Sequence, residues 1–338
     1  MILVTGGLGY IGSHTVVSLV ESGYEVIIVD DLSNSSLDVL DGIEDITGIR
    51  PVFHQFDLND CTKVETLFKT HPAINGILHF AASKAVGESV LDPLKYYQNN
   101  LVVLMNLLGQ IKTKINFVFS SSCTVYGQSD ELPISENTPT KRPESPYGNT
   151  KKVCEEILED YSQSNQAIRT ISLRYFNPIG AHASNKIGEN PKGVPQNLIP
   201  YITQSAIGRI PQLTVHGTDY PTPDGTCIRD YIHVVDLANA HVAALSYLEK
   251  NTSSASFDVF NLGTGKGSSV LEVIESFNRV SDRKLEYTLG PKRAGDIISA
   301  YASIDKATKL LQWRPKHSLD EAVLSAWNWE KNNDVTKA

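Results

Sequence analysis

Short apolar runs alternate with amphipathic stretches along the first half of the chain. The apolar runs predict β-strands at 2–4, 25–29, 51–53, 76–80 and 116–119. Apolar residues at helical spacing predict helices at 11–20, 60–70 and 94–111. Strands that are apolar almost throughout are typical of a parallel sheet covered by helices on both faces. The pattern therefore predicts a doubly wound α/β fold that binds its ligands at the C-terminal ends of the strands.

The pattern changes after Tyr175-Phe176-Asn177-Pro178. A loop rich in glycine and asparagine follows at 180–197, and less regular sequence continues to about 230. We expect a first domain over 1–178 and a smaller second domain over 179–338. The segment 257–280 returns to a strand–loop–helix pattern, so we expect it to rejoin the main sheet.

The first predicted strand leads into a glycine loop, Gly6-Gly7-Leu8-Gly9-Tyr10-Ile11-Gly12. Such a loop allows a tight turn, close approach of a pyrophosphate, and an anion at the helix N-terminus. Asp30 ends the second strand, where a carboxylate accepts from a ribose 2′-hydroxyl and repels a 2′-phosphate. The next residues, Asp31, Leu32 and Ser33, include no arginine. The interpretation is an NAD site rather than an NADP site; the alternative is a glycine turn that serves structure alone.

Tyr147 and Lys151 lie one helical turn apart, just after Ser145 and Pro146. Serine favours the N-cap of a helix and proline its first position. The same stripe continues through Cys154, so we expect it to face inward, where packing does not require a lysine. An ammonium beside a phenol lowers the phenol pKa from its usual value of about 10, which suits proton transfer. The alternative is a chance pairing on a half-buried helix.

A run of hydroxyl side chains, Ser120-Ser121-Ser122, directly follows the strand at 116–119. The C-terminal end of a strand is where this fold exposes its site. One of these hydroxyls, with Thr124 nearby, can bond a substrate oxygen beside Tyr147. Taken alone, the run could be an ordinary serine-rich turn.

Composition limits the ligands. The formal net charge is −8 with no basic block, which argues against a nucleic-acid partner. The nine histidines show no zinc spacing, so we expect no metal, and we interpret His233 and His241 as structural. The four cysteines are scattered, and the N-terminus shows no signal peptide or membrane-length apolar run. We therefore expect a cytoplasmic protein with no membrane partner.

These motifs, with others along nearly the whole chain, resemble the extended short-chain dehydrogenase/reductase family and, within it, the UDP-glucose 4-epimerases. The most specific matches are Lys84-Ala85-Val86-Gly87-Glu88-Ser89, Asp219-Tyr220-Pro221-Thr222 with Asp224-Gly225-Thr226, and Arg229-Asp230-Tyr231. Further matches are His79-Phe80-Ala81-Ala82, Ser145-Pro146-Tyr147-Gly148, Leu173-Arg174-Tyr175-Phe176-Asn177-Pro178, Asn261-Leu262-Gly263 and Arg293-x-Gly295-Asp296.

The resemblance implies a role for each matching position. It implies that the first domain is an NAD-binding Rossmann unit and that the second binds a UDP-sugar. The implied catalytic residues are Ser122, Tyr147 and Lys151, supported by Thr124. The implied NAD site adds to these three Gly6, Gly9, Tyr10, Ile11, Gly12, Asp30, Asn34, Asp57, Leu58, Phe80, Ala81, Lys84, Asn99 and Phe176. The implied UDP-sugar site consists of Asn177, Asn197, Leu198, Thr214, Val215, His216, Arg229, Arg293, Asp296 and Ala300. In an acidic protein the two arginines suit a diphosphate, although either could form a surface ion pair.

The implied activity is NAD-dependent interconversion of UDP-glucose and UDP-galactose through a transient 4-keto sugar. Two alternatives stay open: another nucleotide-sugar enzyme of this fold, and a catalytically silent dinucleotide-binding protein. A 4,6-dehydratase should place carboxylates beside the serine, but Cys123-Thr124-Val125 offers none. The resemblance also implies a homodimer through helices near 94–111 and 147–164, although Leu101, Leu104 and Leu108 could equally be core.

The resemblance further places a sugar-pocket gate at Ala300, four residues after Asp296. A bulky tyrosine in this place accompanies restriction to glucose and galactose. We therefore expect the small Ala300 side chain to admit UDP-GlcNAc and UDP-GalNAc as well. The alternatives are that Ala300 only packs in a strand, or that a one-residue slip makes Tyr301 the gate.

Overall fold

The computed structural model describes residues 1–251, 256–293 and 296–333. Its centre is a seven-stranded sheet in the order β11-β6-β5-β4-β1-β2-β3, with every neighbouring pair parallel. The strands are β1 (Ile2–Thr5), β2 (Val26–Asp30), β3 (Val52–Gln55), β4 (Gly76–His79), β5 (Ile115–Ser122), β6 (Ile168–Tyr175) and β11 (Phe257–Leu262). The predicted doubly wound parallel fold is confirmed, and each of the five predicted strands lies in this sheet.

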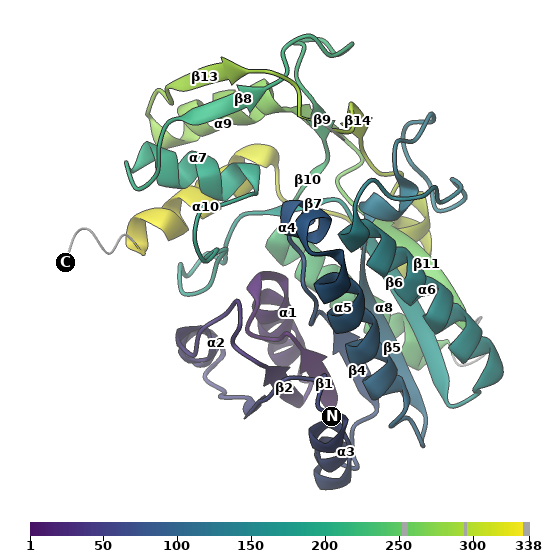
Figure 1. Cartoon of the computed structure of the whole chain (residues 1–338). Helices are drawn as coiled ribbons and strands as arrows, with labels where there is room; N and C mark the ends of the chain where they lie inside the picture. The colour runs from purple at the N-terminus through teal and green to yellow at the C-terminus, as the bar shows by residue number, and fades with distance from the viewer. Residues whose placement is uncertain (252–255, 294–295, 334–338) are drawn as a thin grey trace.

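Helices cover both faces of the sheet (Figure 1). Along β1 the side chains of Ile2 and Val4 join one apolar cluster, whereas Leu3 joins the other. This period-two alternation gives each strand two buried faces. The first face carries α1 (Tyr10–Glu21), α2 (Asp38–Thr47) and α8 (Val234–Lys250). The second carries α3 (Cys61–Thr70), α5 (Pro93–Leu108) and α6 (Pro146–Ser164), and the short α4 (Val86–Leu91) precedes α5.

Helix α6 begins where its capping residues predict. The Ser145 hydroxyl accepts from the Gly148 N–H at 3.2 Å, and Pro146 is the first helical residue. A cap of this kind is worth about 1 kcal/mol. Tyr147 is therefore presented in the first turn of the helix. Helix α2 was not predicted: its apolar stripe of Val39, Leu40, Ile43 and Ile46 is short, and Gly42 within it is a poor helix former.

The segment after residue 233 returns to the main sheet, although the preceding residues belong to the smaller elements. Helix α8 packs against α1, and β11 pairs in parallel with β6 from Phe257↔Thr170 to Leu262↔Tyr175. The 257–280 segment thus adds a strand to the sheet and then continues into α9 (Val270–Ser281).

A smaller unit lies beyond the C-terminal ends of the strands (Figure 1). Its apolar cluster includes Phe277 and Trp327, whose rings pack edge to face with 5.3 Å between the ring centres. The elements around it are α7 (Leu198–Ala206), β8 (Leu213–His216), α9, β13 (Tyr287–Gly290) and α10 (Leu319–Asn332). Between the units, β7 (Asn177–Ile179) pairs with β10 (Tyr231–His233), and β9 (Ile228–Arg229) lies between β12 (Ser268–Ser269) and β14 (Ser299–Ala300). A short π-helical turn, η2 (Ala307–Leu311), packs against α8.

Within the described ranges, no helix combines the length and apolar character that a membrane crossing requires.

Candidate active site

The glycine loop joins the end of β1 to α1 with almost no free space. Gly6 has a φ of +66°, and a Cβ placed there would lie 2.7 Å from the Ala81 nitrogen. A Cβ on Gly12 would lie 2.2 Å from the Gly6 carbonyl oxygen. Any side chain at these positions would push the turn open. The glycines are therefore required by the turn that brings the N-terminus of α1 to this edge of the sheet.

Asp30 lies at the end of β2, directly beside the glycine loop. Its Oδ2 accepts from the Leu8 N–H at 3.0 Å, while Oδ1 accepts from the Leu32 N–H at 3.0 Å and the Ser35 hydroxyl at 2.8 Å. The carboxylate thus joins the glycine loop to the loop after β2, which carries Asn34. A fixed anion next to a glycine turn fits the ribose of NAD and disfavours a 2′-phosphate.

The other residues assigned to the cofactor lie at the same edge. Asp57 and Leu58 follow β3, and Phe80, Ala81 and Lys84 follow β4. Asn99 of α5 donates to the Ser83 hydroxyl at 3.2 Å and accepts from Asn59 at 2.9 Å, which links the loops after β3 and β4. Tyr10, in the first turn of α1 before Ile11, donates its hydroxyl to the Gly180 carbonyl at 2.7 Å. These positions form one edge that fits a dinucleotide.

The serine run ends at the turn η1 (Cys123–Tyr126). Ser122 Oγ accepts from the Thr124 N–H at 3.2 Å and from the Thr124 hydroxyl at 3.0 Å. The hydrogen of the Ser122 hydroxyl is therefore left for another acceptor, and the Ser122 hydroxyl acts to lower the pKa of the Tyr147 phenol. Thr124 also packs against α6, since a Cβ on Gly148 would lie 3.2 Å from the Thr124 side chain. Thr124 thus holds the serine against the helix that carries Tyr147.

The electrostatics of Tyr147 differ from the expectation. Burial raises the pKa of Tyr147 to about 12; a negative charge on the Cys123 sulfur would raise it further, while the Ser122 hydroxyl lowers it. Burial also lowers the pKa of Lys151 to about 8. The Lys151 ammonium donates to the Ser120 carbonyl at 2.7 Å and lies 4.9 Å from the centre of the Phe119 ring. The expected lowering of the Tyr147 pKa by Lys151 is wrong for the protein alone, because desolvation dominates the shift and Lys151, which is bonded to the Ser120 carbonyl, is not among the groups that cause it.

The two arginines assigned to the diphosphate lie around one buried phenol. Burial raises the pKa of Tyr231 to about 12, and both Arg229 and Arg293 act in the opposite direction. Arg293 forms a two-pronged ion pair with Asp296, at 3.0 Å and 2.9 Å, and its side chain is 60% exposed. Arg229 donates to the Ile228 carbonyl at 2.9 Å. The surface ion pair considered for either arginine is present at Arg293, and Gly295 of its motif lies outside the described residues.

The remaining substrate positions lie on the smaller elements. Asn177 begins β7, and Phe176 before it is buried beside Val125 and Ala300. Asn197 precedes Leu198 at the start of α7 and donates to the Glu189 carboxylate at 2.6 Å. In β8, the Thr214 hydroxyl bonds Thr288 at 3.1 Å, Val215 is buried, and His216 meets the Pro291 carbonyl at 3.2 Å.

Ala300 and Tyr301 occupy opposite faces of the segment that contains β14. Ala300 pairs with Arg229 in register and is only 6% exposed, in the apolar cluster with Phe176 and Val125. Tyr301 lies instead against Gly267, where a Cβ would be 3.1 Å from its ring. Ala300 is therefore the one of the two that lies on the side of Phe176 and the serine turn.

A buried ionic network under the site was not predicted. Glu155, one turn after Lys151 on α6, accepts from Arg174 of β6 at 2.5–3.1 Å and from the Ser172 hydroxyl at 2.7 Å. Arg174 also donates to the Tyr126 hydroxyl at 2.9 Å, and Tyr126 donates to Asn261 of β11 at 2.8 Å. The network joins α6, the serine turn and two strands. The motif Leu173-Arg174-Tyr175 contained the arginine, but nothing in the sequence indicated its partner.

Two further carboxylates near the site were also missed as functional candidates. Asp230 is fully buried and accepts from Thr264, Gly265 and Ala302, which fixes the turn after β11. Burial raises the pKa of Glu189, while Lys84 and the bond from Asn197 lower it. Glu189 thus lies between one residue assigned to the cofactor and one assigned to the substrate. Its only sequence signal was its place in the 180–197 loop.

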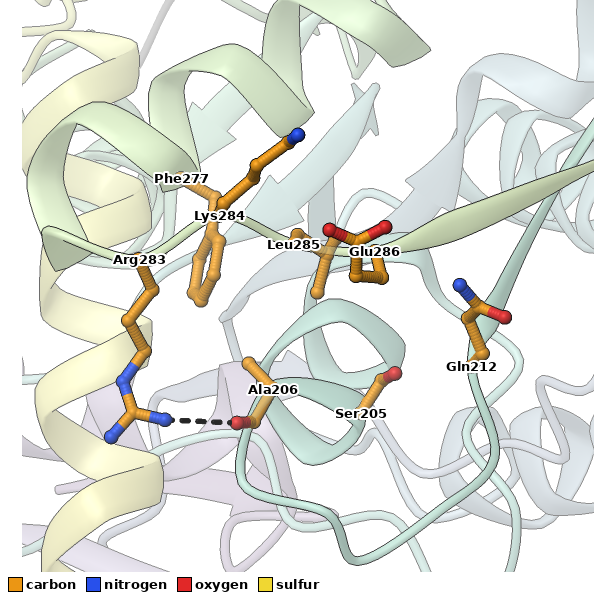
Figure 2. Close-up of a pocket in the computed structure, with 8 residues that line it drawn as sticks. All are labelled: Ser205, Ala206, Gln212, Phe277, Arg283, Lys284, Leu285 and Glu286. Carbon is orange, nitrogen blue, oxygen red and sulfur yellow. Dashed lines mark hydrogen bonds between the residues drawn. The ribbon is translucent and has the colours of Figure 1, made fainter.

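A hollow of about 490 Å³ lies elsewhere, between α7, α9 and β13 (Figure 2). In it Arg283 donates to the Ala206 carbonyl at 3.1 Å and lies 5.2 Å from the centre of the Trp327 ring. None of the residues assigned to catalysis, cofactor or substrate lines it. In the part of the chain that the structure describes, no three His, Cys, Asp or Glu side chains are grouped to hold a metal.

Comparison with known proteins agrees with this geometry. A family model described as GDP-mannose 4,6 dehydratase matches residues 3–325. A UDP-glucose 4-epimerase of Bacillus subtilis (strain 168) is 48% identical over 335 residues, which cover 98% of this chain and 97% of that protein. A crystal structure of the Stenotrophomonas maltophila UDP-glucose 4-epimerase, with bound NAD and formylated UDP-arabinopyranose, has a TM-score of 0.94 and 45% identity, covering 98% of both chains.

The corresponding structure from Bifidobacterium longum, in complex with NAD+ and UDP, has a TM-score of 0.93 and 44% identity, again over 98% of both chains. These matches each cover 98% of the chain, so the similarity extends over nearly the whole fold. The chain therefore belongs to the extended short-chain dehydrogenase/reductase family and, within it, to the UDP-glucose 4-epimerases.

Proposed function

We propose that the protein interconverts UDP-glucose and UDP-galactose by oxidation and re-reduction at C4 of the sugar, with NAD as its resident cofactor. The observation that carries the proposal is the grouping of Ser122, Tyr147 and Lys151 at the C-terminal end of β5, two strands away from β1 and its glycine loop. When bound, NAD accepts a hydride from C4 and returns it to the opposite face of the 4-keto sugar.

Each residue of the set has a distinct task. The Tyr147 phenolate removes the proton of the sugar 4-hydroxyl, and Tyr147 later gives it back. The Ser122 hydroxyl, oriented by Thr124, holds the same oxygen during the transfer. Because burial raises the pKa of Tyr147 to about 12, Lys151 needs help to stabilise the phenolate. The positive charge of an oxidised nicotinamide ring nearby would lower the phenol pKa in the same direction as Lys151.

The two units divide the ligands between them. Residues 1–178, with the returning strand β11 and helix α8 on the sheet, hold the dinucleotide. The rest of 179–338 holds the UDP group, with Arg229 as the cation for the diphosphate and Arg293 released from Asp296 to join it. Residues 252–255, 294–295 and 334–338 of this range lie outside the described part. The 4-keto sugar can turn about its link to the diphosphate while the arginines keep the nucleotide in place.

Activity without added cofactor tests the proposal. Purified protein should convert UDP-galactose to UDP-glucose with no NAD supplied, and denaturation should release about one NAD per chain. Enzymatic detection of UDP-glucose and assay of the released dinucleotide measure both quantities. An active preparation that depends strictly on added NADP would contradict the cofactor and the role of Asp30. Protein that binds NAD but leaves every UDP-hexose unchanged would favour the silent dinucleotide-binding alternative.

The name of the matching family model raises the 4,6-dehydratase as an alternative. That reaction eliminates water across C5 and C6 and needs an acid and a base beside the serine. The residues after Ser122 are Cys123, Thr124 and Val125, and the nearby Asp230 carboxylate is taken up by its four hydrogen bonds. The local chemistry therefore favours epimerisation.

Substrate breadth is a second prediction. We expect the wild-type protein to interconvert UDP-GlcNAc and UDP-GalNAc as well, because Ala300 leaves space beside the sugar C2 substituent. Ala300→Tyr should lower kcat/KM for the N-acetylated sugars by about 10–200-fold, the usual range for a steric change in a pocket. Turnover of UDP-galactose should change little.

Tyr301→Ala serves as the control, because Tyr301 lies on the other face against Gly267. It should not widen the substrate range. Steady-state kinetics on both pairs of sugars give the comparison. A wild-type protein inactive on UDP-GalNAc would show that Ala300 only packs in its strand.

Assembly is a third prediction. Leu104 and Leu108 are core residues, as the sequence allowed, but α5 still exposes Leu94 at 77% and Met105 at 48%. We propose that these side chains, with the outer face of α6, form the interface of a homodimer. Light scattering should give twice the mass of 37.1 kDa, independent of concentration. A constant monomer mass across micromolar concentrations would refute the interface.

We also propose a cytosolic location. Each of the four cysteines has a free thiol, which suits a reducing compartment. Cell fractionation tests this assignment.

A further inference from the structure

The loop at 180–197 makes specific contacts with both units of the molecule. It joins β7 to α7, and on its way it passes close to α2 (Figure 1). We call residues 186–192 the strap. Ile187 of the strap is 1% exposed and packs in the same cluster as Leu40 and Ile43 of α2. Lys186 pairs with Asp45 of α2 at 2.8 Å, so the strap is fixed to the dinucleotide half of the molecule.

The strap lies tightly between the two units. A Cβ on Gly42 would lie 2.8 Å from the Lys186 carbonyl oxygen, so the strap backbone touches α2 directly. On the other side, a Cβ on Gly188 would lie 2.5 Å from the Trp329 ring of α10, and the indole N–H donates to the Glu189 carbonyl at 3.2 Å. The strap is therefore held between α2 on one side and α10 on the other.

At its end the strap holds the loop after β2. The Lys192 ammonium donates to the carbonyls of Leu32 and Ser33, at 2.9 Å and 2.8 Å. Leu32 has a φ of +63°, a conformation that a leucine adopts only when its surroundings enforce it. The same loop is bound from inside by Asp30, through the Leu32 N–H and the Ser35 hydroxyl. Asp30 and Lys192 thus hold opposite sides of one strained turn.

We propose that Lys192 is a positioning residue for the dinucleotide: it keeps the turn at 31–35 in the conformation that presents Asp30 and Asn34, and so slows release of the cofactor. The identity of the cofactor rests on the proposed function. We expect release of the adenosine end to require outward movement of this turn, which would break both bonds to the ammonium. The strap is held by Ile187 in the apolar cluster and by the bond from Trp329 to the Glu189 carbonyl, so we expect Lys192 to stay behind when the turn moves.

Replacement of the ammonium tests the proposal. Lys192→Met keeps the length of the side chain and removes both hydrogen bonds. We expect NAD to dissociate about three- to tenfold faster, the range expected for loss of hydrogen bonds that a charged group makes at a surface. Displacement of bound NAD by fluorescent etheno-NAD gives the rate, and dinucleotide retained after long dialysis gives a second readout. At saturating NAD, kcat should stay at the wild-type value. Lys192→Arg should restore slow release.

Lys112→Met is the matched control. The Lys112 ammonium also donates to a backbone carbonyl, that of Gly109 at 3.1 Å, but lies just before β5 at the opposite edge of the sheet. It should leave NAD release unchanged. Release from Lys192→Met at the wild-type rate would overturn the role of Lys192 while leaving the proposed function intact. Wild-type protein that neither contains nor binds NAD would instead overturn the proposed function.

Discussion

Tyr147→Phe should lower kcat for UDP-galactose by at least about 10²–10⁴-fold, the usual contribution of general acid–base catalysis. The substitution removes one oxygen, the proposed acceptor of the sugar proton, and leaves the ring in place. Because Ser122 and Lys151 keep their own partners, Thr124 and the Ser120 carbonyl, the fold and NAD content should be unchanged. Steady-state kinetics with the NAD content measured in parallel separate lost chemistry from lost cofactor.

Tyr161→Phe provides the control on the same helix. Its hydroxyl donates to the Leu108 carbonyl at 2.8 Å, about four helical turns after Tyr147, and takes no part in the proposed chemistry. This variant should retain nearly full activity. If Tyr147→Phe turned over at close to the wild-type rate with its fold intact, Tyr147 would not be the proton acceptor.

Glu155→Gln should reduce the free energy of unfolding by about 3–5 kcal/mol, the cost of leaving one partner of a buried ion pair alone. Arg174 and Glu155 have side-chain exposures of 8% and 7%, so water cannot solvate the remaining guanidinium. The change lies beneath Lys151, and activity should fall with stability. Urea unfolding, followed by both fluorescence and circular dichroism, measures the shift.

Two further variants make the result specific. Glu159→Gln, one turn later on the exposed side of α6, should change stability by less than about 0.5 kcal/mol. The double variant Glu155→Met with Arg174→Met should recover much of the loss, because apolar side chains of similar volume remove the unpaired charge. Equal, small effects of Glu155→Gln and Glu159→Gln would show that the network contributes little to stability.

Elements whose signals lie within a few residues could be predicted from the amino-acid sequence. The apolar runs identified five strands of the sheet, and the Ser145–Pro146 pair marked the start of α6. The glycine loop followed from sterics that operate within a few residues, and the spacing of Tyr147 and Lys151 follows from one turn of a helix. Helix α2 was not predicted, because it is only ten residues long and contains Gly42.

Properties that depend on segments far apart in the chain became visible in the folded structure. Burial set the high pKa of Tyr147, and no neighbour in the sequence reveals how much water surrounds a phenol. The partner of Arg174 lies 19 residues away, and the carbonyls that bind Lys192 lie 159 and 160 residues away. The register that puts Ala300 beside Arg229 is likewise a property of strand pairing. A local pattern shows which side chains of one segment are buried. The pairing of charges and the desolvation of a site depend instead on which segments come into contact.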